Sequence, residues 1–319
     1  MAASGARLIP LLALVLVITS CGTHPLDDGY AFLASNRSDW LRGTPAPVQP
    51  ASVVGATPTA GAQASAPAVA NNGPILVYLD PGHGGVDTGT IGTTSDGTTV
   101  EEKNIALAIA LKTADHLRAN GIGVMLSRTD DSLPGSTPAD YSADGKMLTP
   151  DGVLADLQRR IDRANESGAR VLLSIHLNGF TDPSVGGAET FYDPSRPFGD
   201  ESKRFATLVQ NTLIADLRAR GYDTPDRGVT NDEDLQTESL GSLAGNYNHL
   251  VLLGPAVPGR LRPSQMPGAL SEPLFLSNPP EATAVSQADV QDLIATSYAT
   301  AVEAFLNRSE AAAASPAPR

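Results

Sequence analysis

The sequence predicts one α/β domain with a central, mostly parallel or mixed β-sheet of about six strands flanked by helices. Short aliphatic runs alternate with longer amphipathic stretches, as strands alternate with helices in such sheets. Several of the amphipathic stretches end at a glycine, which is typical of a helix C-cap. With 319 residues, 41% of them hydrophobic, the chain can bury one substantial core, while its 25 prolines and 30 glycines are unevenly spread and indicate tails.

The domain is expected to begin with a strand, a helix and a second strand. Residues 75–79 are a continuous aliphatic run, which predicts a buried strand. Residues 103–120 carry apolar side chains at helical spacing and are followed by Gly121, so we expect a helix there. Residues 122–126 form the next apolar run and the next expected strand.

The middle of the domain repeats this order. Residues 151–166 predict a helix closed by Gly168, and residues 171–175 predict another buried strand. A further strand is expected at residues 188–192. The long amphipathic stretch at residues 201–220 then predicts a helix.

The last part of the domain contains two more apolar runs and a closing helix. Residues 249–253 and 269–274 are expected to be the last strands, and residues 287–306 the last helix. Residues 130–150 and 254–267 are rich in Gly, Pro, Ser and Asp, which favours surface loops.

The N-terminal residues predict export and attachment to a membrane. Residues 8–18 are an apolar run too short for a comfortable membrane span, so residues 1–20 are interpreted as a signal peptide. The sequence Ile-Thr-Ser-Cys at positions 18–21 resembles the lipobox of bacterial lipoproteins, in which the cysteine is lipidated. Cys21 is the only cysteine, so it has no partner for an internal disulfide. The alternative is a signal peptide cleaved elsewhere, with Cys21 discarded.

The composition divides the chain further. Residues 21–72 are dominated by Ala, Pro, Ser, Thr and Gly and predict a flexible tether. Residues 73–308 are expected to form the folded domain, and residues 309–319 a disordered tail. The protein would then be a membrane-anchored lipoprotein of the cell envelope that faces away from the cytoplasm.

The charge argues against nucleic acid as a partner. The chain has 22 basic and 35 acidic residues, which give a formal net charge of -13. Such a charge opposes general affinity for nucleic acids and for anionic membrane surfaces. Membrane contact is therefore expected only through the lipid anchor, and no protein partner is evident.

Two histidines directly follow predicted strands. His83 lies in the glycine-rich sequence after residues 75–79, and His176 follows residues 171–175. Ligands collect at the carboxyl ends of strands in open α/β sheets, and catalytic zinc takes imidazole and carboxylate ligands with one position open. Glu101 and Glu102, at the start of the first predicted helix, are candidates for the carboxylate, and spacing alone does not choose between them. The glycine-rich turn around His83 lacks the Lys and Ser/Thr of a phosphate-binding loop, so the sequence argues against phosphate binding there.

Five separated segments then point to a family. They are LDPGHGG (79–85), EKNIAL (102–107), SIHLNG (174–179), GAETFY (187–192) and SEPLFLSN (271–278). In this order they resemble the signature blocks of zinc-dependent N-acetylmuramoyl-L-alanine amidases. The resemblance implies that His83, Glu102 and His176 bind Zn²⁺ and that Glu272 is the catalytic carboxylate. It also implies cleavage of the amide between N-acetylmuramic acid and L-alanine in peptidoglycan, with Asn178 a candidate for substrate binding.

Two departures from the family pattern leave the substrate open. Pro273 follows Glu272 where small residues are usual, and residues 254–267 form an extra loop that we expect to shape or cover the substrate groove. The alternatives are a zinc hydrolase of another envelope peptide or amide, and a muropeptide-binding lipoprotein without activity. His24, His116 and His249 are outside the blocks and are expected to be structural.

Overall fold

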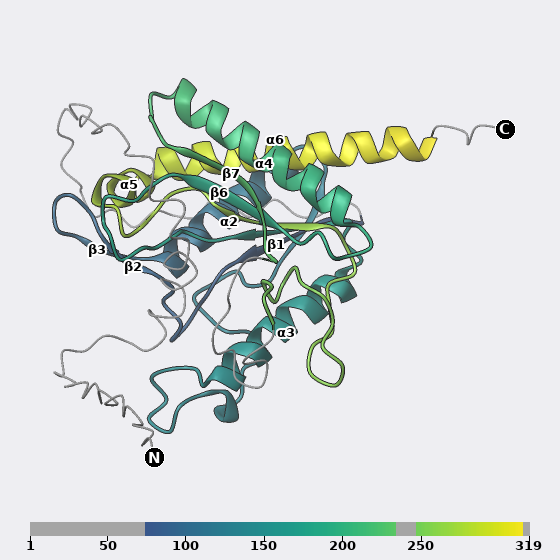
Figure 1. The fold of residues 1–319 in the computed structure, drawn as a ribbon, viewed down its shortest axis with the longest axis horizontal. Coiled ribbons are helices and arrows are strands. Elements are labelled where there is room, and N and C mark those ends of the chain that lie inside the picture. Colours follow the sequence, from purple (N-terminus) through teal and green to yellow (C-terminus); the bar gives the residue numbers. More distant parts are fainter. Residues whose placement is uncertain (1–73, 234–246, 315–319) are drawn as a thin grey trace, which may run out of the picture.

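The structure is a computed structural model that describes residues 74–233 and 247–314 (Figure 1). The expected signal peptide, Cys21, His24 and the tether lie outside the described residues. No helix in the described part of the chain is both long enough and apolar enough to cross a membrane.

A six-stranded sheet with the order β4-β1-β5-β8-β6-β7 forms the centre of the domain. Its strands are β1 (Ile75–Pro81), β4 (Gly123–Leu126), β5 (Val171–Ile175), β6 (Ala188–Tyr192), β7 (Asp226–Asn231) and β8 (Gly268–Glu272). The helices are α2 (Glu102–Ala119), α3 (Pro150–Ser167), α4 (Gly199–Ala219), α5 (Pro279–Val285) and α6 (Ala288–Ala314). A short hairpin of β2 (Ile91–Thr93) and β3 (Thr99–Glu101) precedes α2, and a 3₁₀ turn spans Pro138–Asp140.

Helices cover both faces of the sheet. In Figure 1, α4 and α6 lie side by side on one face and α3 lies on the other. Alternate residues of β1 point to opposite faces, so Val77 and Leu79 pack with α2, α4 and α6 while Tyr78 packs with α3. Buried strands with both faces covered explain the continuous aliphatic runs in the sequence.

The strand directions decide where polar groups meet. β4, β1, β5 and β8 are parallel, so their carboxyl ends share one edge of the sheet. β6 is antiparallel to β8 and parallel to β7, so these two strands begin at that edge and end at the opposite one. β8 ends at Glu272 because Pro273 has no N–H to continue the ladder.

The predicted mixed α/β sheet is confirmed, with one wrong strand and several missed elements. The expected strand at 249–253 is a turn, and its apolar side chains instead pack with α3. The hairpin, α5 and β7 were missed; β7 has the polar sequence DRGVTN and lies at the sheet edge, where burial imposes no apolar pattern. α6 continues to Ala314 and into the expected tail, whose alanines favour helix.

Candidate metal centre and active site

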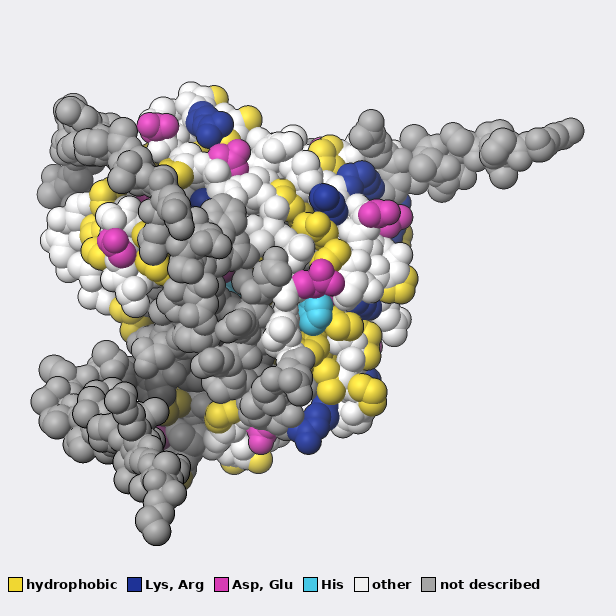
Figure 2. Space-filling view, in the orientation of Figure 1, with side chains coloured by type: hydrophobic (Ala, Val, Ile, Leu, Met, Phe, Trp, Pro, Cys, Tyr) yellow, Lys and Arg dark blue, Asp and Glu magenta, His cyan; other side chains and the backbone are white. Residues whose placement is uncertain are grey.

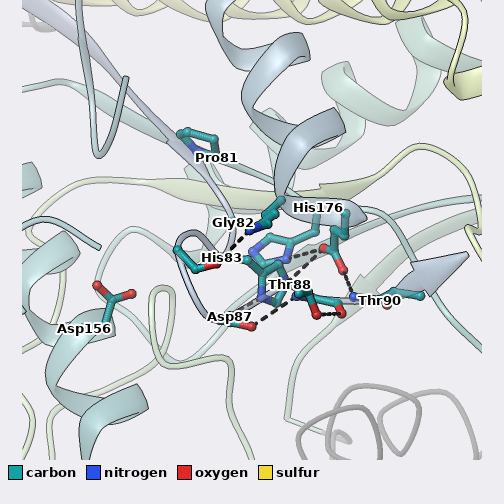
Figure 3. A network of polar contacts seen from close by, with 12 residues as sticks. Pro81, Gly82, His83, Asp87, Thr88, Thr90, Asp156 and His176 are labelled. Atoms are coloured by element: carbon teal, nitrogen blue, oxygen red, sulfur yellow. Dashed lines mark hydrogen bonds and ion pairs between the residues drawn. The ribbon is translucent and has the colours of Figure 1, made fainter. Parts of the chain in front are cut away.

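His83 and His176 meet at the carboxyl edge of the sheet, with Glu102 between them. The Oε1 atom of Glu102 lies 2.9 Å from His176 Nδ1 and 3.1 Å from His83 Nε2. One ligand atom from each of the three side chains lies within 4.8 Å of the other two. All three residues are buried. Figure 3 shows the two imidazoles next to each other, with Asp87 and Thr90 beside them.

The turn that carries His83 has an unusual backbone that two buried arginines hold. His83 has a φ of 60°, in the left-handed region that few residues other than glycine adopt. Arg160 donates to the carbonyl oxygens of His83 and Pro81, at 2.7 and 2.9 Å. Arg128 donates to the carbonyl oxygens of Pro81 and Gly82 at 3.1 and 2.8 Å. These bonds stabilise a turn that aims the His83 imidazole into the site.

The geometry separates Glu102 from its neighbour. Glu102 is buried, and its carboxylate accepts hydrogen bonds from the backbone N–H groups of Leu177 and Thr90 at 3.0 and 2.8 Å. Glu101 turns away, toward Lys103 at 3.5 Å and Asn104 at 3.1 Å. The structure therefore brings Glu102, and not Glu101, to the two histidines.

The three side chains fit a zinc ion. Two imidazoles and one carboxylate are a donor set of catalytic zinc sites, and bond lengths of about 2.0–2.1 Å in a tetrahedral site put ligand atoms about 3.3 Å apart. The Glu102 separations of 2.9 and 3.1 Å are close to this value. Asp87 Oδ2 lies 2.9 Å from His83 Nδ1, an outer contact of the kind that orients metal-binding imidazoles.

Glycines allow this close approach. A Cβ atom on Gly82 would lie 2.2 Å from Cε1 of His176. A Cβ atom on Gly89 would lie 2.5 Å from Cδ2 of His83 and 2.6 Å from Oε2 of Glu102. Any larger residue at either position would therefore displace a candidate ligand.

The charges at this site favour a bound cation. Burial opposes the charged form of His83, but Asp87 and Glu102 outweigh it and raise the pKa of the imidazole to about 10. Burial also opposes ionisation of Glu102, yet the two histidines hold the pKa of its carboxyl well below the usual range. The carboxylates thus stabilise positive charge between them.

Glu272 lies at the end of β8 beside a second carboxylate that sequence reasoning did not single out. Its cross-strand neighbour is Glu189, at the start of β6. Burial raises the pKa of Glu272 well above its usual range, and Glu102 and Glu189 raise it further. Glu189 accepts a hydrogen bond from Thr230 at 2.7 Å and lies 3.4 Å from Arg227. An acidic residue inside the otherwise uncharged run Ala188–Tyr192 was the signal that could have revealed it.

The remaining predicted features have mixed outcomes. Asn178, two residues after His176, is buried, and its Oδ1 accepts from the Gly179 N–H at 2.8 Å, which stabilises the local turn. The backbone N–H groups of Arg262 and Gln265 dock loop 254–267 on α3, and the loop leads into the start of β8, at the edge opposite Glu272. That this loop shapes or covers the substrate groove stays a prediction.

The sequence of the domain matches a known family. Residues 77–304 match the family described as N-acetylmuramoyl-L-alanine amidase. The chain belongs to the N-acetylmuramoyl-L-alanine amidase family. Its reaction is therefore hydrolysis of the amide bond between N-acetylmuramic acid and L-alanine in peptidoglycan.

Curated relatives agree with this amidase assignment. The chain is 29% identical to the germination-specific N-acetylmuramoyl-L-alanine amidase of Bacillus subtilis (strain 168) over 224 residues, which are 70% of this chain and 76% of that protein. It is 26% identical to the amidase AmiA of Escherichia coli (strain K12) over 258 residues, covering 74% of this chain and 78% of the relative.

Solved amidase structures share the fold. An N-acetylmuramoyl-L-alanine amidase from Clostridium difficile 630 superposes with a TM-score of 0.51 at 30% identity, covering 75% of this chain and 98% of that one. The catalytic domain of the amidase CwlV from Bacillus (Paenibacillus) polymyxa gives a TM-score of 0.51 at 25% identity, covering 73% and 98%. The mixed sheet and its helices are thus the amidase catalytic fold.

Proposed function

We propose that this amidase is zinc-dependent, with the metal held by His83, Glu102 and His176 and with Glu272 as the catalytic carboxylate. The observation that carries the proposal is the convergence of two imidazoles and one carboxylate, from the ends of β1 and β5 and the start of α2. The polar residues around them orient these donors without joining the set.

The chemistry of an amide calls for such a site. When bound, zinc supplies Lewis acidity that polarises the amide carbonyl and activates water. The chain's own residues then move the protons. A Glu272 carboxylate oxygen takes a proton from water as the water oxygen attacks the carbonyl carbon. The same oxygen gives the proton to the alanine nitrogen as the C–N bond breaks, which leaves a lactyl carboxylate and a free stem peptide.

The environment of Glu272 suits both proton transfers. A general base and acid works best with a pKa near the working pH, and an ordinary glutamate lies well below that pH. Burial and the carboxylates Glu102 and Glu189 raise the pKa of Glu272. The carboxyl therefore holds a proton more readily than an exposed glutamate does.

The place of action follows from the substrate and the N-terminal sequence. Peptidoglycan lies outside the cytoplasmic membrane, so the chain must be exported to meet it. We propose that Cys21 is lipidated and that residues 21–72 tether the amidase domain to the membrane. Asn178, two residues after His176 in the sequence, is proposed to line the path of the stem peptide.

The proposal is tested by comparing metal content and product release in matched variants. The full chain is incubated with defined muropeptides, with and without a chelator, and the products are identified by mass spectrometry. We expect free stem peptide only with zinc. Glu272→Ala should lower turnover by about 10²–10⁴-fold while zinc remains bound, because it removes the proton carrier and no ligand.

Glu102→Ala and Glu101→Ala form a matched pair for the metal ligand. Glu102→Ala should lose zinc and activity, whereas Glu101→Ala should keep both because its carboxylate faces Lys103. Equal zinc content in both variants would refute the ligand assignment. Normal turnover in Glu272→Ala would refute the role of that carboxylate.

A further inference from the structure

A second group of metal-ligating side chains lies at the opposite edge of the sheet. Asp193 directly follows β6 and Asp232 directly follows β7, and the Asp232 N–H donates to the Tyr192 carbonyl at 3.0 Å. His249 lies against both: its Nδ1 atom is 3.0 Å from Asp193 Oδ2 and 3.3 Å from Asp232 Oδ1. One ligand atom from each of the three residues lies within 4.8 Å of the others.

Local hydrogen bonds orient both carboxylates toward this point. Asp193 Oδ1 accepts from the backbone N–H and the hydroxyl of Ser195, each at 2.6 Å. Asp232 Oδ2 accepts from the Leu250 N–H at 2.9 Å. The remaining oxygen of each carboxylate therefore faces His249 Nδ1, as outer hydrogen bonds orient the ligands of a metal site.

One imidazole nitrogen cannot satisfy two buried carboxylates. His249 Nδ1 carries at most one hydrogen, and its hydrogen bond goes to Asp232. The Asp193 side chain is 1% exposed, and within the described parts of the chain no hydrogen bond reaches its Oδ2 atom. This buried oxygen therefore shares its ion-pair contact, the His249 imidazole at 3.0 Å, with the carboxylate of Asp232.

Among the described residues, Arg196 is a cation that interacts with the charge of Asp193. Its guanidinium nevertheless donates hydrogen bonds to the carbonyl oxygens of Leu253, Gly254 and Ser264.

We propose that Asp193, Asp232 and His249 form a second metal site that takes a divalent transition-metal cation such as Zn²⁺. Two carboxylate oxygens neutralise the ion, and the deprotonated Nδ1 of His249 completes three ligands. The nitrogen ligand favours zinc over calcium or magnesium, which prefer oxygen ligands. The separations of 3.0 and 3.3 Å fit ligand atoms around zinc, which are about 3.3 Å apart.

The site is structural, because it is remote from the amide-cleaving residues. β6 and β8 are antiparallel, so Asp193 lies toward the start of β8 while Glu272 lies at its end. His249 begins the turn at residues 249–253, where the sequence had predicted a strand. This turn packs on the α3 face of the sheet. The metal would tie that turn to the ends of β6 and β7.

Zinc counting on histidine variants tests the second site. The full chain is stripped of metal with a chelator and equilibrated with Zn²⁺ alone, and bound zinc is measured by mass spectrometry. We expect about two equivalents in the wild type. His176→Gln and His249→Gln should each lose one equivalent, and His249→Gln should retain amidase activity. His116→Gln is the matched control, because His116 pairs with Asp292 at the surface and should leave both equivalents in place.

Two further measurements distinguish loss of the second zinc site from a folding defect in His249→Gln. Zn²⁺ should raise the melting temperature of His176→Gln, and this shift should vanish in His176→Gln/His249→Gln. Asp232→Asn, which keeps the shape of the side chain, should also lose one equivalent. A single equivalent in the wild type that His176→Gln abolishes, or full zinc content in His249→Gln, would overturn the second site. A single equivalent in the wild type that His249→Gln abolishes and His176→Gln leaves in place would count against the proposed catalytic zinc and leave the second site standing.

Discussion

At the scale of single residues, neighbours outside the ligand set support each candidate ligand of the proposed catalytic metal. Asp87 contacts His83 Nδ1, and the N–H groups of Thr90 and Leu177 donate to the Glu102 carboxylate. Gly82 has no side chain and so leaves room for the His176 imidazole. Such support keeps donors in place before a metal arrives, which reduces the free energy needed to organise the site.

Glu189 is predicted to set the proton affinity of Glu272. Glu189→Gln removes a negative charge that raises the pKa of Glu272, so that pKa should fall. Because the base must be ionised to accept a proton, the acidic limb of the kcat/KM profile should move to lower pH. The measurement is kcat/KM against pH on a defined muropeptide.

The control for this variant is Glu303→Gln, an α6 carboxylate that pairs with Asn120 on the surface. It should leave the pH profile unchanged. If Glu189→Gln lowers activity equally at all pH values, Glu189 supports the fold of the site and does not tune Glu272.

The site residues differ in how far the sequence could predict them. Strand-end position alone singled out His83 and His176, and the structure brings them together. Glu102 could be chosen as the ligand only from the family resemblance, because Glu101 and Glu102 both lie at the start of the predicted helix and their positions there do not distinguish them. Glu189 could not be paired with Glu272 from sequence, since their contact depends on the antiparallel register of β6 and β8.

At the scale of elements, Arg160 joins α3 to the end of β1. Its guanidinium donates to Asp80 Oδ1 at 2.9 Å and to Asp156 Oδ2 at 2.7 Å, as well as to the turn carrying His83. Burial would raise the pKa of Asp80, but Arg160 and a hydrogen bond from Ser127 outweigh it and lower that pKa to about 2. The helix therefore positions a candidate metal ligand through a buried ion pair.

The Asp80 ion pair predicts a loss of stability in acid. A carboxyl whose pKa is lowered on folding stabilises the fold above its unfolded value of 3.8, and this contribution is lost as pH falls toward about 2. The shift corresponds to about 2 kcal/mol of unfolding free energy. The difference in that free energy between wild type and Asp80→Asn should thus shrink from pH 5 to pH 2, roughly the window that separates the two pKa values.

Urea unfolding in the presence of a chelator measures this difference without a contribution from metal release. Asp223→Asn, at an exposed position, is the control and should differ little from wild type at any pH. A wild-type advantage over Asp80→Asn that stays constant down to pH 2 would contradict the role of the ion pair.

Elements with both faces buried were the predictable ones. β1, β4 and β5 follow from apolar runs, and α3 from its periodicity and its cap at Gly168, where φ is 65°. β7 and the β2–β3 hairpin are short or polar, and pairing with a neighbouring strand stabilises them more than an apolar pattern does. Residues 249–253 were wrongly predicted to be a strand, because a buried turn and a buried strand can have the same apolar sequence pattern.

At the scale of the whole molecule, the sheet separates two polar centres. The proposed catalytic residues lie at the carboxyl edge of β1, β5 and β8, and the Asp193 cluster lies at the edge where β6 and β7 end. On the face drawn in Figure 2, basic and acidic side chains are dispersed among uncharged ones, in line with the scattered charges of the sequence. Among the described large hydrophobic residues, only Ile91 is exposed.

The last prediction concerns how the domain is held near its substrate. Cys21→Ser in the full chain removes the proposed lipidation site and leaves the amidase residues untouched. Acyl chains stabilise membrane binding by about 0.8 kcal/mol per buried CH₂ group, so the variant should move from the membrane fraction to the soluble fraction. Its turnover of soluble muropeptides should equal that of the wild type, because the proposed tether would act on reach and not on chemistry. Ser35→Thr, a conservative change in the proposed tether and outside the lipobox-like sequence, is the control and should remain with the membrane. A Cys21→Ser chain that still sediments with membranes, or a wild-type chain that does not, would contradict the anchor and leave the assignment of the catalytic residues unchanged.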